Sequence, residues 1–172
     1  MSNYKEIDVS QLFFKIEKIR EIYDILWGKN KEKIARLDET VYCTISYALL
    51  YAFLDNLYEI FAPKKSWSSG TTLYKLMKFM EGHKESQSDK IAEGIELMIA
   101  DYEGNIRGIV ESRLKPLRHK LLVHLDKNSN EELVKEMKSL SDNTIDYSYP
   151  LMLLEYAESV VKFTRIMEKG AN

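Results

Sequence analysis

The chain has 172 residues, a single cysteine and a net charge of -2 at neutral pH. This length suits one domain that buries its core without disulfides or metals, and one cysteine excludes an internal disulfide and favours a reducing compartment. Hydrophobic residues make up 45% and charged residues 30% of the chain, as in soluble globular proteins and unlike disordered ones. The N-terminus begins no apolar signal core and no apolar stretch is long enough to span a bilayer, so we expect a cytoplasmic protein without a membrane partner.

The first two predicted helices occupy the N-terminal third. Ser10 suits the N-cap of the first, whose apolar residues repeat at intervals of three and four, and Gly28 ends it. The polar stretch 29–33 is expected to be a loop or a loose turn. The second helix is predicted over about 38–61. Its expected inner face comprises Ser46, Leu50, Phe53, Leu54, Leu57 and Phe61.

Polar residues mark the starts of the next two predicted helices. Thr71 or Thr72 can cap a third helix that ends near residue 80, and a polar connection over 82–88 follows. Ser88 or Asp89 can cap a fourth helix. The apolar residues of the fourth helix are Ile91, Ile95, Met98, Ile99 and Tyr102. Because glycines at 104 and 108 weaken a helix, its continuation to residue 112 stays open.

Pro116 suits the first turn of a helix better than its middle, so we expect a new helix or a kink near Lys115. A short helix over 130–140 and a last helix over 149–168 are also predicted. The apolar residues of the last helix are Leu153, Leu154, Ala157, Val160, Val161, Thr164 and Met167. No stretch alternates like a strand and no linker divides the chain. We therefore predict a single all-α domain over 1–172, an antiparallel bundle of about five to six helices.

Charge is unevenly distributed along the chain. Residues 107–127 contain six basic and two acidic residues, a net charge of +4, so the remainder carries -6. A polyanion would be attracted to this segment and repelled by much of the rest. The distribution therefore favours a polyanion as a partner at this segment.

Arg118 and His124 stand out within the basic segment. A guanidinium binds phosphate in a bidentate way and an imidazole titrates near neutral pH, and these are two of the parts that metal-free RNA cleavage needs. On an ideal helix the two positions lie about 120° apart and about 9 Å along the axis. Two helices packed across a homodimer would therefore assemble the pair better than one helix. The plainer interpretation is a basic surface helix with an incidental histidine.

The stretch 117–126, Leu-Arg-His-Lys-Leu-Leu-Val-His-Leu-Asp, resembles the signature of the HEPN superfamily. These are all-helical domains of toxins, abortive-infection proteins and RNA-processing factors. Their signature is Arg, a polar residue, four variable residues and His, matched here by Arg118, His119 and His124. Residues 47–58 are also similar to the second helix of the abortive-infection branch, in which an acid stands among apolar residues.

The resemblance implies metal-independent endoribonuclease activity in a symmetric dimer whose two motifs meet in a cleft. On that interpretation His124 transfers the proton, Arg118 orients and neutralises the scissile phosphate, and His119 tunes the site. Lys115 and Lys120 would contact phosphates of the substrate. The alternative for both lysines is ordinary solvation.

The second helix carries two features that the sequence leaves open. Asp55 either hydrogen-bonds Arg118 and holds it in place, or is a solvent-facing carboxylate. Tyr47, Tyr51 and Tyr58 form a stripe at helical spacing. The stripe is either a dimer surface or the half-buried edge of the core, which is the commoner case.

The sequence predicts no metal and no cofactor, because metal-ligand spacings and Gly-rich phosphate loops are missing. A second hypothesis is a non-catalytic HEPN-like module that binds RNA or pairs with a protein such as a nucleotidyltransferase antitoxin. The acidic overall balance favours it. A plain structural bundle is the third hypothesis, and it predicts no loss of function when His124 is replaced.

Overall fold

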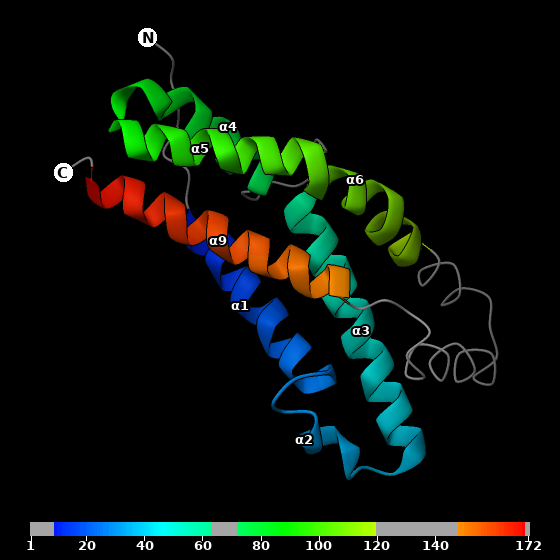
Figure 1. Ribbon diagram of the computed structural model, residues 1–172. Coiled ribbons are helices and arrows are strands. Elements are labelled where there is room, and N and C mark those ends of the chain that lie inside the picture. The colour runs from blue at the N-terminus through cyan, green and yellow to red at the C-terminus, as the bar shows by residue number, and fades with distance from the viewer. Residues whose placement is uncertain (1–8, 63–71, 120–147, 171–172) are drawn as a thin grey trace.

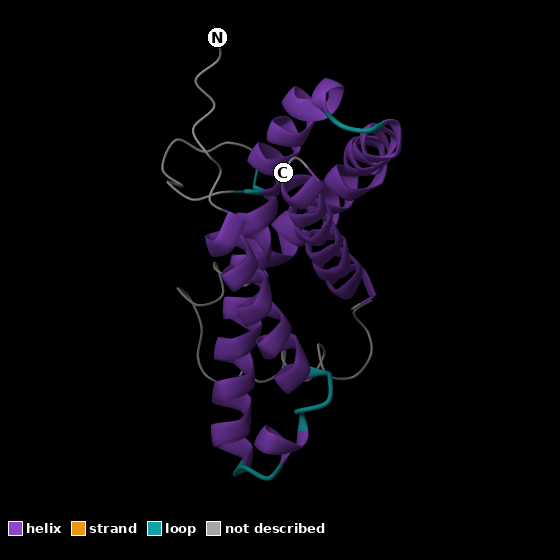
Figure 2. Cartoon of the chain, turned by 90° about the vertical axis from the view of Figure 1, so that its left-hand side faces the viewer, coloured by secondary structure: helices purple, strands orange, loops and turns teal. Residues whose placement is uncertain are grey.

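The computed structural model describes residues 9–62, 72–119 and 148–170. Throughout these three ranges the chain forms helices and no strand, and the helices pack against one another around a shared apolar core (Figures 1 and 2). The predicted all-α helical bundle is confirmed. The helices predicted over 130–140 and over the C-terminal part of 115–125 lie outside the described residues.

The N-terminal region forms α1 (Val9–Leu26), the short α2 (Glu32–Ala35) and α3 (Glu39–Phe61). Asp38 caps α3 by accepting a hydrogen bond from the Thr40 amide at 3.0 Å, and the predicted inner face of α3 is buried. The prediction for Ser10 is wrong, because Ser10 lies inside α1 instead of at its N-cap. The stretch 29–33 is a turn as far as residue 31, as expected, but its last two residues begin α2, whose Ile34 is buried.

Thr72 caps α4 (Leu73–His83) by accepting a hydrogen bond from the Lys75 amide at 3.3 Å, so the second of the two candidate threonines is the cap. The helix ends three residues later than predicted. At this end, Nδ1 of His83 lies 2.9 Å from the Phe79 carbonyl oxygen, and the tilted rings of the two residues are 4.2 Å apart. A 3₁₀ turn, η1 (Lys84–Ser86), then leads to α5.

The segment from 89 to 119 is helical throughout, and we name it the long helix. It consists of α5 (Asp89–Asp101), the π-helical η2 (Tyr102–Ile106), α6 (Arg107–Ile109), the π-helical η3 (Val110–Leu114) and the helical residues 115–119. Of the two alternatives predicted near Lys115, a new helix or a kink, the new helix is wrong, because the helix continues unbroken to residue 119. The Lys115 amide donates a hydrogen bond to the Val110 carbonyl and closes a π-turn just before Pro116. In a regular α-helix a proline ring clashes with a carbonyl of the preceding turn, and the wider π-turn gives the ring more room.

A four-residue apolar repeat explains the π-turns of the long helix. Its buried residues are Tyr102, Ile106, Val110 and Leu114. In a regular α-helix, positions four apart drift by about 40° per repeat, so the stripe would rotate away from the core. Mixing α-turns with wider π-turns gives roughly four residues per turn and keeps the stripe on one face. Burial of these four side chains therefore favours the widened backbone.

The C-terminal helix α9 (Ser148–Gly170) closes the core by packing against α1, α3 and α4 (Figure 1). All seven apolar-face positions predicted for it are buried. Arg20 of α1 also donates two hydrogen bonds to the Glu158 carboxylate of α9, at 2.8 and 2.9 Å. This ion pair fixes how α1 and α9 lie against each other.

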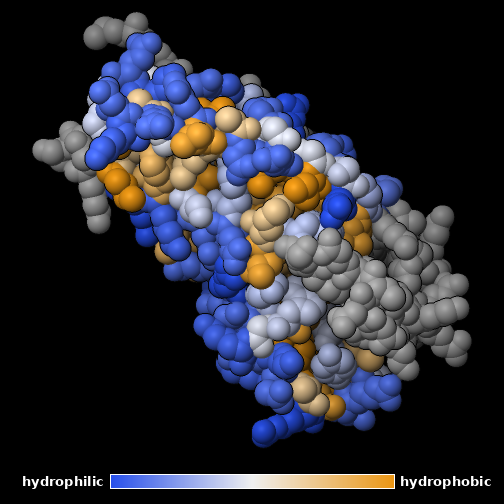
Figure 3. All heavy atoms as spheres, viewed as in Figure 1, coloured by the Kyte–Doolittle hydropathy of each residue, from blue (hydrophilic) through white to orange (hydrophobic). Residues whose placement is uncertain are grey.

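The surface of the bundle shows scattered apolar residues. On the face seen in Figure 3, hydrophobic residues form islands among hydrophilic ones over α5 and α9. The most exposed large apolar side chains of the described residues are Leu97, Phe14 and Ile166, each on a different helix. None of the described helices combines the length and apolarity that a bilayer crossing requires.

Gly94 allows close packing of α5 on α9, and we expect its replacement to destabilise the fold. A Cβ atom there would lie 2.7 Å from Cζ of Phe163, whereas a Cβ at Gly108 would meet no atom within 4 Å. Gly94→Ala and Gly108→Ala gain the same helix propensity, so their difference isolates the clash. Urea unfolding should show Gly94→Ala to be less stable than Gly108→Ala by about 1–3 kcal/mol. Equal stabilities would contradict this packing.

Candidate functional site

Arg118 lies near the end of the long helix and is held against α3. Its Nε donates a hydrogen bond of 2.6 Å to Oδ1 of Asp55, and its guanidinium carbon lies 4.9 Å from the centre of the Tyr58 ring. The side chains of Arg118 and Asp55 are 30% and 26% exposed. Of the two sequence interpretations of Asp55, the contact with Arg118 is the one that the structure shows.

The four-residue repeat accounts for this position of Arg118. Arg118 follows Leu114 by four residues, so it continues the buried stripe that begins at Tyr102. In a regular α-helix, Arg118 would be rotated by about 160° from Tyr102 after four repeats. The widened helix instead brings it to α3, where Asp55 and Tyr58 lie three residues apart and share a helix face.

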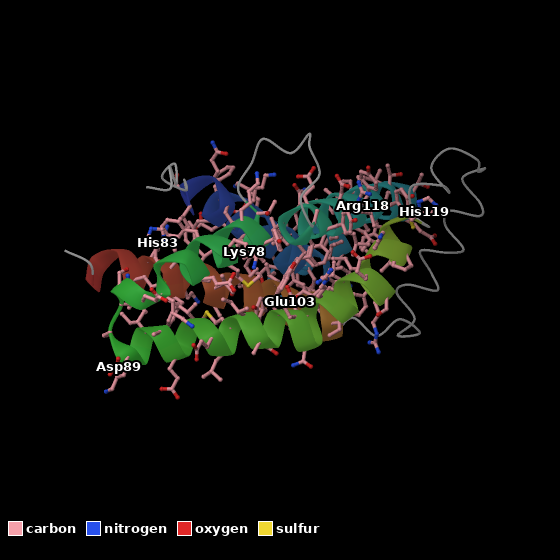
Figure 4. The ribbon with its side chains drawn as sticks, turned by 90° about the horizontal axis from the view of Figure 1, so that it is seen from above. Lys78, His83, Asp89, Glu103, Arg118 and His119 are labelled. Carbon is pink, nitrogen blue, oxygen red and sulfur yellow. The ribbon has the colours of Figure 1, made fainter. Side chains whose placement is uncertain are left out.

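His119 and Lys115 lie on a different face of the long helix from Arg118. Both are exposed, and they belong to a second four-residue series that consists of Glu103, Arg107, Glu111, Lys115 and His119. Lys115 donates a hydrogen bond to Glu111 at 2.7 Å, and this bond raises the pKa of Lys115. Figure 4 shows Arg118 and His119 at one end of the long helix and Asp89 at the other.

Two of the residues predicted for the site, Lys120 and His124, lie outside the described residues. The structure therefore brings Arg118 and Asp55 together, adds Tyr58 to them, and places His119 and Lys115 on the neighbouring exposed face. Tyr58 was assigned by sequence only to the tyrosine stripe. Because Tyr58 lies three residues after Asp55, on the same helix face, the sequence could have indicated that both residues contact Arg118.

The basic segment is less positive in the fold than in the sequence. Acids from outside the segment neutralise two of its arginines, because Glu103 pairs with Arg107 at 2.8 Å and Asp55 pairs with Arg118. Lys115 is paired with Glu111 inside the segment. Attraction of a polyanion to this end of the long helix is therefore weaker than a net charge of +4 suggests.

The tyrosine stripe of α3 belongs to the core. Tyr47 and Tyr58 are each 7% exposed, and Tyr51 is half-buried. Of the two interpretations left open by the sequence, the edge of the core is therefore the one that the structure supports.

A pocket of about 210 Å³ opens between α4 and the long helix, next to the end of α3. Sequence reasoning did not find it. Its lining residues are Phe61, Tyr74, Lys78, Tyr102, Glu103, Arg107, Val110 and Glu111. Figure 4 shows Lys78 and Glu103 midway along these neighbouring helices. Both helices bring charged side chains to the rim, since Lys78 comes from α4 and the other charged residues come from the exposed series of the long helix.

Three of the residues that line the pocket belong to the core. Phe61, Tyr102 and Val110 are almost fully buried, and the Tyr102 hydroxyl donates a hydrogen bond to the Phe61 carbonyl at 3.5 Å. Burial raises the pKa of Tyr102 to about 12. Near neutral pH its hydroxyl is therefore protonated and serves as a structural donor.

Comparison with known proteins found no family model, no curated protein and no solved structure that matches the chain. Among the described residues, no three histidine, cysteine or acidic side chains gather closely enough to hold a metal ion.

A double-mutant cycle on Asp55 and Arg118 should measure a substantial coupling energy. A charge-assisted hydrogen bond is stronger than a neutral one, and partial exposure of both side chains reduces its contribution. We expect Asp55→Ala and Arg118→Ala to be coupled by about 1–2 kcal/mol in urea unfolding of the single and double variants.

The exposed pair Glu111 and Lys115 serves as the matched control for this cycle. It also joins an acid and a base, but its side chains are 41% and 54% exposed, so its coupling should not exceed about 0.5 kcal/mol. Equal coupling in the two cycles would mean that Asp55 does not hold Arg118 more firmly than a surface ion pair does.

Proposed function

We propose that the chain is a HEPN-type endoribonuclease that cleaves RNA without a metal ion, in the manner of toxin and abortive-infection proteins. The proposal combines the Arg118-His119-x4-His124 motif with one structural observation. Arg118 is held at Nε by Asp55 while its side chain remains 30% exposed. The family's motif Arg is thus in a defined orientation and reachable from solvent.

The contact with Asp55 supports a phosphate-binding role for Arg118. A guanidinium has five N–H donors, and the bond to Asp55 uses the one on Nε. Toward the described residues, the two terminal nitrogens keep four donors in a planar fork that matches two phosphate oxygens. Because Asp55 and Tyr58 already restrict the side chain, less conformational entropy is lost when a phosphate binds.

The reaction would proceed by attack of a ribose 2′-oxygen on the adjacent phosphorus atom. The new P–O bond closes a 2′,3′-cyclic phosphate, and the bond to the 5′-oxygen of the next nucleotide breaks. His124 would take the 2′-hydroxyl proton or deliver a proton to the leaving 5′-oxygen. Arg118 would neutralise the charge that builds on the phosphate oxygens, and water and buffer restore the imidazole.

A homodimer would supply the second imidazole that this scheme uses. Arg118 and His124 do not share a face of one ideal helix, as the spacing of six residues dictates. Two copies of the motif facing one groove would place an acid and a base on opposite sides of a single phosphate. The proposal therefore expects a dimer as the active species.

Total cellular RNA incubated with the purified protein in EDTA should be cleaved, and the products should end in cyclic phosphate. Arg118→Ala and His124→Ala should each lower the rate by at least about 100-fold, the lower range of a general acid–base contribution. Gel analysis with product end-group mapping measures both effects. Circular dichroism checks that each variant remains helical.

Arg165→Ala and His83→Ala are the matched controls, because they remove an arginine over Phe13 and a histidine over Phe79, neither of which contacts Arg118. Both should cleave RNA at the wild-type rate. The catalytic proposal fails if wild-type protein leaves the RNA intact, or if the Arg118 and His124 variants cleave it as fast as the controls do.

A non-catalytic HEPN-like module is the second candidate, and the ion pairing of the basic segment favours it. With Arg107, Lys115 and Arg118 each paired with an acid, this end of the long helix suits a protein partner as well as a polyanion. Purification from the native host distinguishes the two candidates. A stoichiometric protein partner without RNA cleavage, and without a growth defect on overexpression, would favour the module.

A further inference from the structure

We infer that the pocket between α4 and the long helix binds one nucleobase of the RNA strand whose phosphate Arg118 holds. The inference rests on the proposed function and adds a second contact for the substrate. Its evidence is the composition of the pocket and its place on the long helix, and neither depends on the Arg-to-His motif.

The pocket has the chemistry that a nucleobase requires. Phe61, Tyr102 and Val110 lie almost fully buried beneath it, and the half-buried Tyr74 ring is the aromatic part of the lining on which a base can stack. Aromatic side chains stack on bases with little sequence preference. An aliphatic ligand would make apolar contacts in the pocket but could not stack on the Tyr74 ring.

The rim offers both kinds of hydrogen-bonding group that the edge of a base needs. Glu103 and Glu111 accept hydrogen bonds from amino and imino groups, while Lys78 and Arg107 donate to ring carbonyls and nitrogens. These rim side chains are 41–61% exposed and are engaged in surface ion pairs. Surface pairs contribute little to stability, so they can exchange partners when a ligand enters.

The exposed four-residue series links the pocket to the motif. Glu103, Arg107 and Glu111 line the pocket, and the next two members of the series are Lys115 and His119, beside Arg118. Glu111 and His119 are about 12 Å apart along the helix axis. This distance equals three to four nucleotides at the roughly 3.4 Å rise of a stacked strand. A single strand lying along this series would reach the pocket and Arg118 together.

Tyr74→Leu tests the inference, because it removes the ring and keeps an apolar side chain in the α4 wall. The experiment uses the full chain carrying His124→Ala, so that a short RNA of mixed sequence stays intact, and measures binding by fluorescence anisotropy. Loss of one base-stacking contact should weaken binding roughly five- to 150-fold. The control Tyr42→Leu, a half-buried tyrosine near the opposite end of α3 from Phe61, should leave binding unchanged.

Nucleoside monophosphates provide the second measurement. With ¹³C-labelled tyrosine, at least one of the four should shift the Tyr74 and Tyr102 ring resonances, whereas ribose 5-phosphate, which has no base, should not. If no monophosphate shifts these rings, the pocket does not bind a base and the inference is overturned. The same follows if a monophosphate binds but Tyr74→Leu leaves RNA binding unchanged, because the pocket then serves a free nucleotide.

The outcomes separate this inference from the proposed function. If Arg118→Ala weakens RNA binding and Tyr74→Leu does not, the pocket inference fails and the role of Arg118 stands. If Tyr74→Leu weakens RNA binding and Arg118→Ala does not, the pocket binds the strand and the phosphate-binding role of Arg118 fails.

Discussion

The long helix contacts α3 through side chains that repeat every four residues, and the position of Arg118 depends on that repeat. Burying Tyr102, Ile106, Val110 and Leu114 on one face requires about four residues per turn, which the two π-helical segments provide. Arg118 takes the next place in the stripe. A hydrophobic constraint that acts over 13 residues thus delivers a charged side chain to its partner on α3.

Asp55 and Tyr58 turn this position into a defined site. Taking a guanidinium partly out of water is unfavourable unless a charge or a π-system compensates, and α3 supplies both. The same contacts restrict the rotamers of Arg118 through its Nε and its guanidinium face. The exposed series on the adjacent face carries Lys115 and His119, and it continues to the pocket lined by Phe61 and Tyr102. One helix therefore carries both the held arginine and part of the lining of the pocket.

Sequence patterns predicted the fold well where burial follows a regular period. The inner faces of α3 and α9 are buried as expected, and Thr72, one of the two threonines proposed to cap the third helix, forms the expected hydrogen bond. The prediction failed at Pro116, because the usual preference of proline for a first turn was weighed without the four-residue repeat that precedes it. That repeat is legible in the sequence and implies a widened helix.

The candidate site was only partly predictable for a related reason. The bond between Asp55 and Arg118 joins residues 63 positions apart, so sequence could offer it only as one of two alternatives. The pocket draws on three helices and has no local signature. In the sequence, the charged residues that the long helix brings to the rim read as an ordinary solvated face with ion pairs four residues apart. They line a pocket only because α4 packs beside them in the fold.

The central claim, that α3 fixes the Arg118 side chain, is tested most directly by arginine ¹H–¹⁵Nε NMR spectra of the wild-type protein and of Asp55→Asn. The Arg118 Nε–H should exchange slowly with solvent and show restricted motion in the wild-type protein, and should lose both properties in the variant. Arg107, whose ion pair is exposed, should exchange faster in both proteins. An Arg118 signal that exchanges as fast as that of Arg107 in the wild-type protein would contradict the account.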